Sequence, residues 1–111
     1  MNYTFEYFGN VILLKILVNK ATVRISDPLK KELIEKINES NNKIVVDLSR
    51  TDFVDSTFLG VLLAGLKKAT LNDGDLRISG LQENVQAIFK LTRLYRIFGI
   101  YNTTEEAIKS F

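Results

Sequence analysis

The stretch 43–70 reads KIVVDLSRTDFVDSTFLGVLLAGLKKAT and decides the fold. It opens with a short β-branched run, Lys43–Leu48, which is typical of a strand in the middle of a parallel sheet. A polar connection, Ser49–Ser56, leads into Thr57–Thr70, where apolar residues cover most of the circumference of a helix. A buried strand followed directly by a buried helix indicates an α/β protein with a central parallel sheet.

The residues before this stretch predict a hairpin and a helix. Aromatic and polar residues alternate over Tyr3–Phe8, as expected for an edge strand with one solvent-exposed face. The pair Gly9-Asn10 predicts a turn into Val11–Val18, a run apolar enough to be covered on both faces. Asp27 before Pro28 predicts the cap and first residue of a helix, because the missing N–H of proline is harmless there.

The residues after it continue the alternation of strands and helices. Asp75–Ser79 predicts a strand, a helix follows around Val85–Leu91, and Ile97–Tyr101 is a short apolar segment. Thr103 and Glu106 fit the capping box of a last helix. The order β-β-α-β-α-β-α-β-α predicts a mixed, mostly parallel sheet of about five strands with helices packed on it.

Length and composition limit what the chain does. Since domains commonly run to roughly 100 to 150 residues, we expect the 111 residues, 1–111, to form one domain. The net charge of +2 gives no reason to expect nucleic acid as a partner. The N-terminus lacks a basic stretch with a long apolar run behind it, so we expect a cytoplasmic protein and no membrane partner.

The absence of His and Cys removes much of enzyme chemistry. Without these residues there is no imidazole base, no thiol nucleophile and no zinc-thiolate site. We therefore expect no enzyme activity, no metal and no cofactor. The remaining candidates for a magnesium site are the carboxylates of Asp47, Asp52 and Asp55. A phosphoacceptor site would also need acidic residues at the end of the preceding strand, where Leu17–Lys20 has none.

The residues Asp55-Ser56-Thr57 lie where the polar connection meets the buried helix. Asp55 or Ser56 is the expected N-cap, a structural role that contributes about 1 kcal/mol. A functional role is also open, because a phosphate on Ser56 would meet unpaired amides and the positive end of the helix dipole. Ser56 would then be a switch rather than a nucleophile.

Two further sequence patterns resemble functional motifs but can also be explained by structure alone. Gly60 and Gly65 have the spacing of a phosphate loop but lie within an apolar helix, so we interpret them as allowing close approach to the sheet. Lys90, Arg93 and Arg96 recur near helical spacing and form either a basic patch or, more commonly, a solvated face.

The element order, together with the runs VVDLS (45–49) and FVDSTFLGVL (53–62), resembles the STAS domain of bacterial anti-sigma factor antagonists. The likeness continues through SGL (79–81) and EEA (105–107) and covers nearly the whole chain. It implies a module that binds an anti-sigma factor with serine kinase activity, a GHKL-type ATPase, and so frees a sigma factor. Other STAS proteins are further implied partners.

In the resembled family the partner kinase phosphorylates the Ser of an Asp-Ser-Ser/Thr motif, which here is Ser56. Asp55 carries over as its neighbour, and Thr57 as the second hydroxyl and second candidate for phosphorylation. Phe58 and Leu59 complete the predicted partner-binding surface.

The chain departs from the family pattern at two places. Phe58 stands where the family has Gly, and Asn19–Thr22 stands where it has Gly-x-Leu-Asp, with Thr22 in place of the Asp. An alternative function is therefore a divergent STAS scaffold subunit that is never phosphorylated. A small-ligand binder or enzyme is a third hypothesis, with few acid, base or nucleophile candidates to support it.

The position of Phe58 leads to a specific prediction. If Leu59, Leu62, Leu63 and Leu66 fill the inward stripe of the helix, Phe58 points partly outward beside Ser56 and anchors a partner. The competing interpretation places the ring in the core.

Overall fold

The computed structural model describes all residues from Met1 to Phe111. Five strands form the main sheet in the order β1 (Tyr3–Phe8), β2 (Val11–Ile16), β4 (Lys43–Asp47), β6 (Asp75–Ser79) and β7 (Gly99–Tyr101). β1 is an edge strand that pairs antiparallel with β2, and every other neighbouring pair in this sheet is parallel. The predicted mixed, mostly parallel sheet is confirmed.

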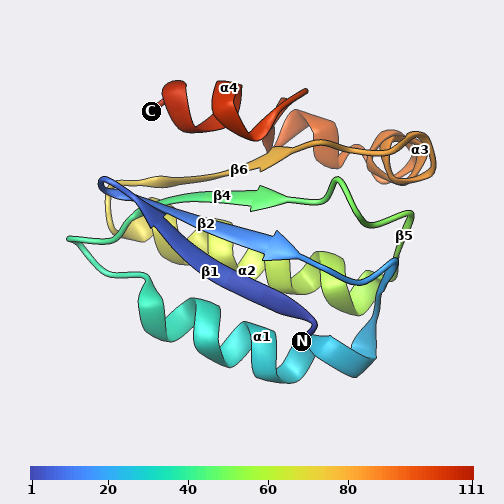
Figure 1. Cartoon of the computed structure of the whole chain (residues 1–111), viewed down its shortest axis with the longest axis horizontal. Coiled ribbons are helices and arrows are strands. Elements are labelled where there is room, and N and C mark those ends of the chain that lie inside the picture. The colour runs from blue at the N-terminus through green and yellow to red at the C-terminus, as the bar shows by residue number, and fades with distance from the viewer.

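Helices cover both faces of this sheet. They are α1 (Val23–Lys36), α2 (Ser56–Leu71), α3 (Glu83–Leu91) and α4 (Thr104–Lys109), with a 3-10 turn, η1 (Leu94–Arg96), after α3. Figure 1 shows α1 and α2 together below the sheet and α4 above it. None of these helices combines the length and the apolar content that a membrane crossing requires.

The two faces of the sheet bury very different amounts of apolar surface. The face under α1, α2 and α3 belongs to a cluster of 23 buried residues, which includes Ile12, Ile44 and Ile78. The α4 face holds a cluster of four, namely Val11, Leu13, Val45 and Ala107. Since successive side chains of a strand point to opposite faces, β2 is buried on both, as its apolar run predicted.

The start of α1 differs from the prediction. The helix begins at Val23 with Thr22 as its N-cap, so Asp27 is not the cap and Pro28 lies inside the helix. Tertiary packing decides the boundary, because Ile25 and Ser26 are buried and the Ser26 hydroxyl donates to the carbonyl of Thr22 at 2.8 Å. Pro28 has no N–H, so the helix lacks one backbone hydrogen bond at this position, and the burial of Ile25 and Ser26 offsets that loss.

A second, two-stranded sheet joins the segments that precede α1 and α2. It pairs β3 (Lys20–Ala21) with β5 (Phe53–Val54) in parallel. Ala21 and Val54 point inward, at 0% and 2% exposure, and Lys20 and Phe53 point outward. This small sheet holds the starting points of the two helices next to each other.

The two glycines of α2 behave differently. A Cβ added at Gly65 would lie 2.8 Å from side-chain atoms of Leu33 and Leu76, so the close approach of the helix predicted there is confirmed. A Cβ at Gly60 would meet nothing within 4 Å, and the same prediction for Gly60 is wrong. Gly60 lies on the exposed side of the helix.

Candidate functional site

The site centres on Asp55, the residue before α2. One carboxylate oxygen, Oδ1, accepts the backbone N–H of Phe58 at 2.8 Å, which caps α2. The other, Oδ2, accepts the backbone N–H of Val23 at 2.8 Å, in the first turn of α1. Asp55 therefore satisfies unpaired amides of two helices and places its negative charge at the positive end of both dipoles.

Backbone hydrogen bonds fix the loop around Asp55 to the loop before α1. The amide of Asp55 donates to the carbonyl of Ala21 at 3.2 Å, and the amide of Asp52 donates to that of Asn19 at 2.8 Å. Below them, the fully buried Thr51 donates its hydroxyl to the carbonyl of Val18 at 2.9 Å. These hydrogen bonds hold the segment before α2 against the segment before α1.

Ser56 and Thr57 are exposed to solvent in the first turn of α2. Of the two caps that the sequence left open, the structure has Asp55 and not Ser56. Because Asp55 supplies the capping oxygen, the Ser56 hydroxyl is not needed to hold the helix. It lies in solvent at a helix N-terminus, where a phosphate can be accommodated.

The predicted outward position of Phe58 is wrong. Its side chain is 0% exposed and is among the largest fully buried side chains of the protein. Leu59 is also buried, at 7% exposure, whereas Leu63, expected in the inward stripe, is 37% exposed. Of the predicted partner-binding residues, Phe58 and Leu59 therefore support the site from within and offer no exposed surface to a partner.

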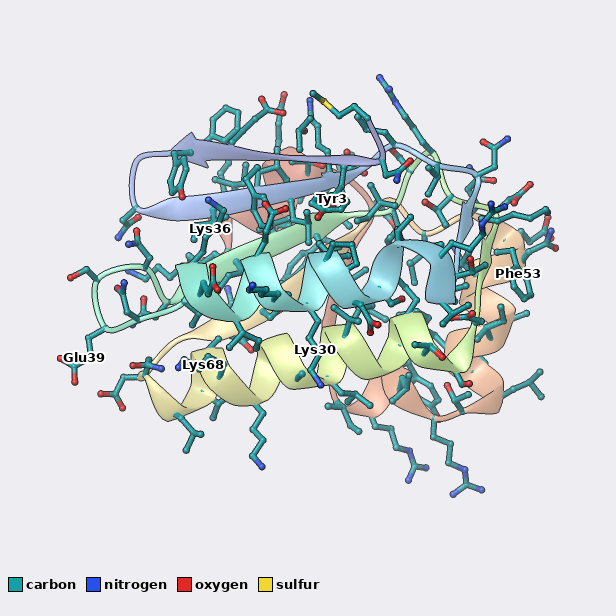
Figure 2. The ribbon with its side chains drawn as sticks, turned by 90° about the horizontal axis from the view of Figure 1, so that it is seen from below. Tyr3, Lys30, Lys36, Glu39, Phe53 and Lys68 are labelled. Atoms are coloured by element: carbon teal, nitrogen blue, oxygen red, sulfur yellow. The ribbon has the colours of Figure 1, made fainter.

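A different aromatic residue is exposed near Ser56. Phe53 on β5 is 42% exposed, and the ammonium of Lys20 lies 5.9 Å from the centroid of its ring. Figure 2 places Phe53 at the end of the molecule where α1 and α2 begin. Val23, whose amide Asp55 binds, is 58% exposed at the same end. Sequence reasoning missed Phe53, because a two-residue strand carries no periodicity that separates its inner from its outer side chain. It missed Val23, because the start of α1 was expected at Asp27 and Pro28.

The three carboxylates considered for a metal do not converge. Asp47 accepts the amide of Ser49 at 2.9 Å, and Asp52 faces the ammonium of Lys20 at 3.8 Å. Asp55 is occupied with the two helix amides. No group of three acidic residues lies close enough to hold a metal ion.

Thr22 has a structural task at the position that departs from the resembled family. Its hydroxyl oxygen accepts the amide of Arg24 at 3.4 Å and caps α1, two residues before that amide. The carboxylate that binds an amide of α1 is that of Asp55, which accepts the amide of Val23.

Comparison with known proteins identifies relatives along the whole chain. The model of the STAS domain family matches residues 18–107. BtrV of Bordetella bronchiseptica, provisionally named an anti-sigma factor antagonist, is 28% identical over 113 aligned positions, which span 100% of this chain and 95% of BtrV.

Solved structures give the same result for the fold. The crystal structure of a protein from Thermotoga maritima, also provisionally described as an anti-sigma factor antagonist, superposes with a TM-score of 0.86 at 28% identity, over 97% of this chain and 92% of that one. The anti-sigma factor antagonist SpoIIAA of Bacillus, solved in its phosphorylated form, shares the fold with a TM-score of 0.74 at 16% identity, over 97% of each chain.

Proposed function

This chain belongs to the STAS domain family of anti-sigma factor antagonists, and we propose that it binds an anti-sigma factor and is switched by phosphorylation of Ser56. Binding would withdraw the anti-sigma factor from its sigma factor. The proposed partner is itself the serine kinase, a GHKL-type ATPase, so that the same contact brings Ser56 to the kinase active site. The chain acts by binding and not by catalysis.

The observation that carries this proposal is the exposed Ser56 hydroxyl on a helix start that Asp55 caps. A phosphate added there would be favoured by the helix dipole by roughly 0.3 to 1 kcal/mol and opposed by the charge of Asp55. These effects offset each other, so the modification changes the surface and leaves the fold intact. The phosphorylated structure of SpoIIAA, a protein of the same fold, supports a phosphate on this architecture.

We propose that the partner contacts a surface made by Val23, Phe53, Ser56 and Thr57, which we name the Ser56 face. Asp55 joins these residues, since it holds both the α1 and the α2 start. Phe53 supplies the exposed aromatic anchor that was expected from Phe58. Aromatic side chains next to polar groups are common centres of binding energy in protein interfaces.

A constitutive scaffold that binds through the same face without phosphorylation is the second candidate. Thr22 favours it, because a capping hydroxyl stands where the family sequence has an acidic side chain close to the phosphorylated Ser. The Phe58 departure does not favour it, since that ring is buried and leaves the surface unchanged.

Binding to the anti-sigma factors encoded in the same genome, measured by calorimetry with purified proteins, tests the proposal. We expect one of them to bind the unmodified chain, and Ser56→Glu to weaken that complex tenfold or more, about 1.4 kcal/mol. Thr70→Glu is the matched control, because Thr70 is exposed at the other end of the same helix. Equal losses in both variants, or no binding by any anti-sigma factor, would contradict the proposal.

A further inference from the structure

The outer side of β1 is the longest unpaired strand edge of the protein. β1 has six residues and one neighbour, β2, whereas β7 at the other edge of the main sheet has three residues. A groove of about 520 Å³ follows β1 and is lined by residues 1–5 and by Pro28 and Glu32 of α1. Since successive side chains of a strand point to opposite faces, a groove that touches five residues in a row runs along the backbone edge itself.

Every second residue of β1 presents its backbone to this open edge. Hydrogen-bonded and non-hydrogen-bonded pairs alternate along two antiparallel strands. The carbonyl of Asn2 accepts the amide of Leu17 at 2.8 Å, so the even-numbered residues of the segment are the ones that bond to β2. The amides and carbonyls of Tyr3, Phe5 and Tyr7 therefore point away from β2, where no strand of this chain pairs with them.

β1 lacks the features that usually protect a free edge. Proteins block such edges with lysine, proline, a bulge or a very short strand, because an open edge invites pairing with another strand. β1 contains no lysine and no proline, and its register with β2 runs without a bulge from Tyr3 to Phe8. Its one charged side chain, Glu6, is engaged by the ammonium of Lys15 at 3.2 Å. An unprotected edge of this length is suited to the addition of a strand.

We propose that the free edge of β1 pairs antiparallel with the same edge of a second copy of this chain. The two main sheets then join into one continuous sheet across a two-fold axis, an arrangement in which both copies contribute the same surface. None of the residues that line the groove belongs to the Ser56 face. The proposal is therefore independent of the function proposed for that face.

Charge decides where the two-fold axis crosses β1. The outward-pointing groups of both copies pair best when the axis passes near the middle of the strand, at Thr4, Phe5 or Glu6. An axis at Glu6 would place two carboxylates directly opposite each other, which is unfavourable. An axis at Phe5 would bring the two Lys36 ammonium groups together, because each lies 4.9 Å from the ring centroid of its own Phe5. An axis at Thr4 avoids both repulsions.

The register with Thr4 on the axis also pairs opposite charges. It places Tyr3 opposite Phe5 of the second copy. The Tyr3 hydroxyl donates to Glu32 at 2.8 Å, and Lys36 lies over Phe5, so Glu32 of each copy approaches Lys36 of the other. Figure 2 shows Tyr3 and Lys36 on the side of α1 that faces β1. Neither Glu32 nor Lys36 has an ion pair within its own chain, so both are available to the second copy.

The surface beside the groove suits a second copy better than other occupants. Charges of both signs follow one another along α1, from Lys31 and Glu32 to Glu35 and Lys36, so no excess of one sign attracts a polyanion. An unrelated strand could bond to the backbone of β1 but would have to bring its own matching charges. A second copy supplies them by symmetry. The same register sets Met1, 95% exposed, opposite Tyr7, 56% exposed, which adds an apolar contact at each end.

A charge-swap experiment at Thr4 tests both the contact and its register. Sedimentation equilibrium of the full chain, up to about 1 mM, should show a monomer–dimer equilibrium. Thr4→Lys and Thr4→Glu, each alone, should weaken the dimer at least tenfold, because like charges then oppose each other on the axis. An equimolar mixture of the two variants should restore dimerisation, since the introduced lysine and glutamate face each other. Thr70→Lys and Thr70→Glu, exposed at the far end of α2, are the matched controls and should dimerise as the unmodified chain does.

Tyr7→Pro tests the backbone contribution without disturbing β2. The amide of Tyr7 points outward, so proline removes only a donor of the free edge, and the thermal midpoint should change little while the dimer weakens severalfold. Ser56→Glu should dimerise normally, which separates this contact from the Ser56 face. A chain that stays monomeric up to about 1 mM, a dimer that the Thr4 variants leave unchanged, or a mixture that shows no recovery would overturn the proposal. A monomer whose β1 amide shifts move only on addition of another protein would assign the edge to a foreign strand and would overturn it as well.

Discussion

The first turn of α2 has a polar side that faces solvent and an apolar side that faces the core. Ser56 and Thr57 face solvent, whereas Phe58 is completely buried two residues after Ser56. A helix turns by about 100° per residue, so a separation of two residues places side chains about 200° apart, on opposite sides. Proximity to a motif in the sequence therefore does not place a residue on the surface of the site.

This difference predicts that mutations on the inner side lower stability and mutations on the outer side lower affinity. Phe58→Ala tests the inner side and has the largest expected effect. We expect a loss of about 3 to 5 kcal/mol in the free energy of unfolding, because the truncation leaves a cavity in a fully buried position. Denaturant unfolding measures it, and an unchanged midpoint would show that the ring is not part of the core.

Asp55→Ala tests the residue that joins the two sides. Loss of the caps on α1 and α2 should cost about 2 kcal/mol, since single caps contribute roughly 0.5 to 2 kcal/mol. Asp55→Asn should cost about half as much, because an amide keeps one acceptor but presents a donor to the second helix amide. Equal stability of both variants and the unmodified chain, measured by thermal unfolding, would show that the shared cap does not hold the helices.

Phe53→Ala tests the outer side. The thermal midpoint should stay nearly constant, and the affinity for the anti-sigma factor should fall about tenfold, which corresponds to about 1.4 kcal/mol. Phe8→Ala is the control, because Phe8 is similarly exposed, at 47%, but lies at the turn between β1 and β2, at the other end of the sheet (Figure 1). Equal loss of affinity in both variants would count against a specific role for Phe53.

Thr57→Val has the smallest expected effect. Thr57 is exposed and does not cap the helix, so the free energy of unfolding should change by less than about 0.5 kcal/mol. Phosphorylation of Ser56 in this variant should proceed as before. A variant that is no longer phosphorylated would show that Thr57 is the modified residue or part of the recognition by the kinase.

The sequence predicted those elements that carry a clear pattern. The alternation in β1, the apolar runs of β2 and β4, and the caps Asp55 and Thr103 all appear as expected, with the Thr103 hydroxyl accepting the amide of Glu106 at 3.1 Å. These features depend on neighbours within a few positions. Local chemistry is sufficient to specify them.

The missed features depend on contacts between distant residues. Asp27 and Pro28 offer a good local helix start, but the burial of Ile25 and Ser26 moves it to Val23. The second helix amide bound by Asp55 belongs to Val23, a residue 32 positions away. The exposure of Phe53 follows from the pairing of β3 with β5, strands too short to leave a pattern in the sequence.

The central claim is that Ser56 is a switch on a surface whose support stays intact. Its most direct test is to incubate the chain with its cognate anti-sigma factor kinase and ATP, map the modified residue by tandem mass spectrometry, and measure affinity and thermal midpoint of the product. We predict one phosphoryl group on Ser56, an affinity reduced about tenfold or more, and an unchanged midpoint. Modification confined to Thr57, no modification, or a loss of affinity that accompanies unfolding would contradict it.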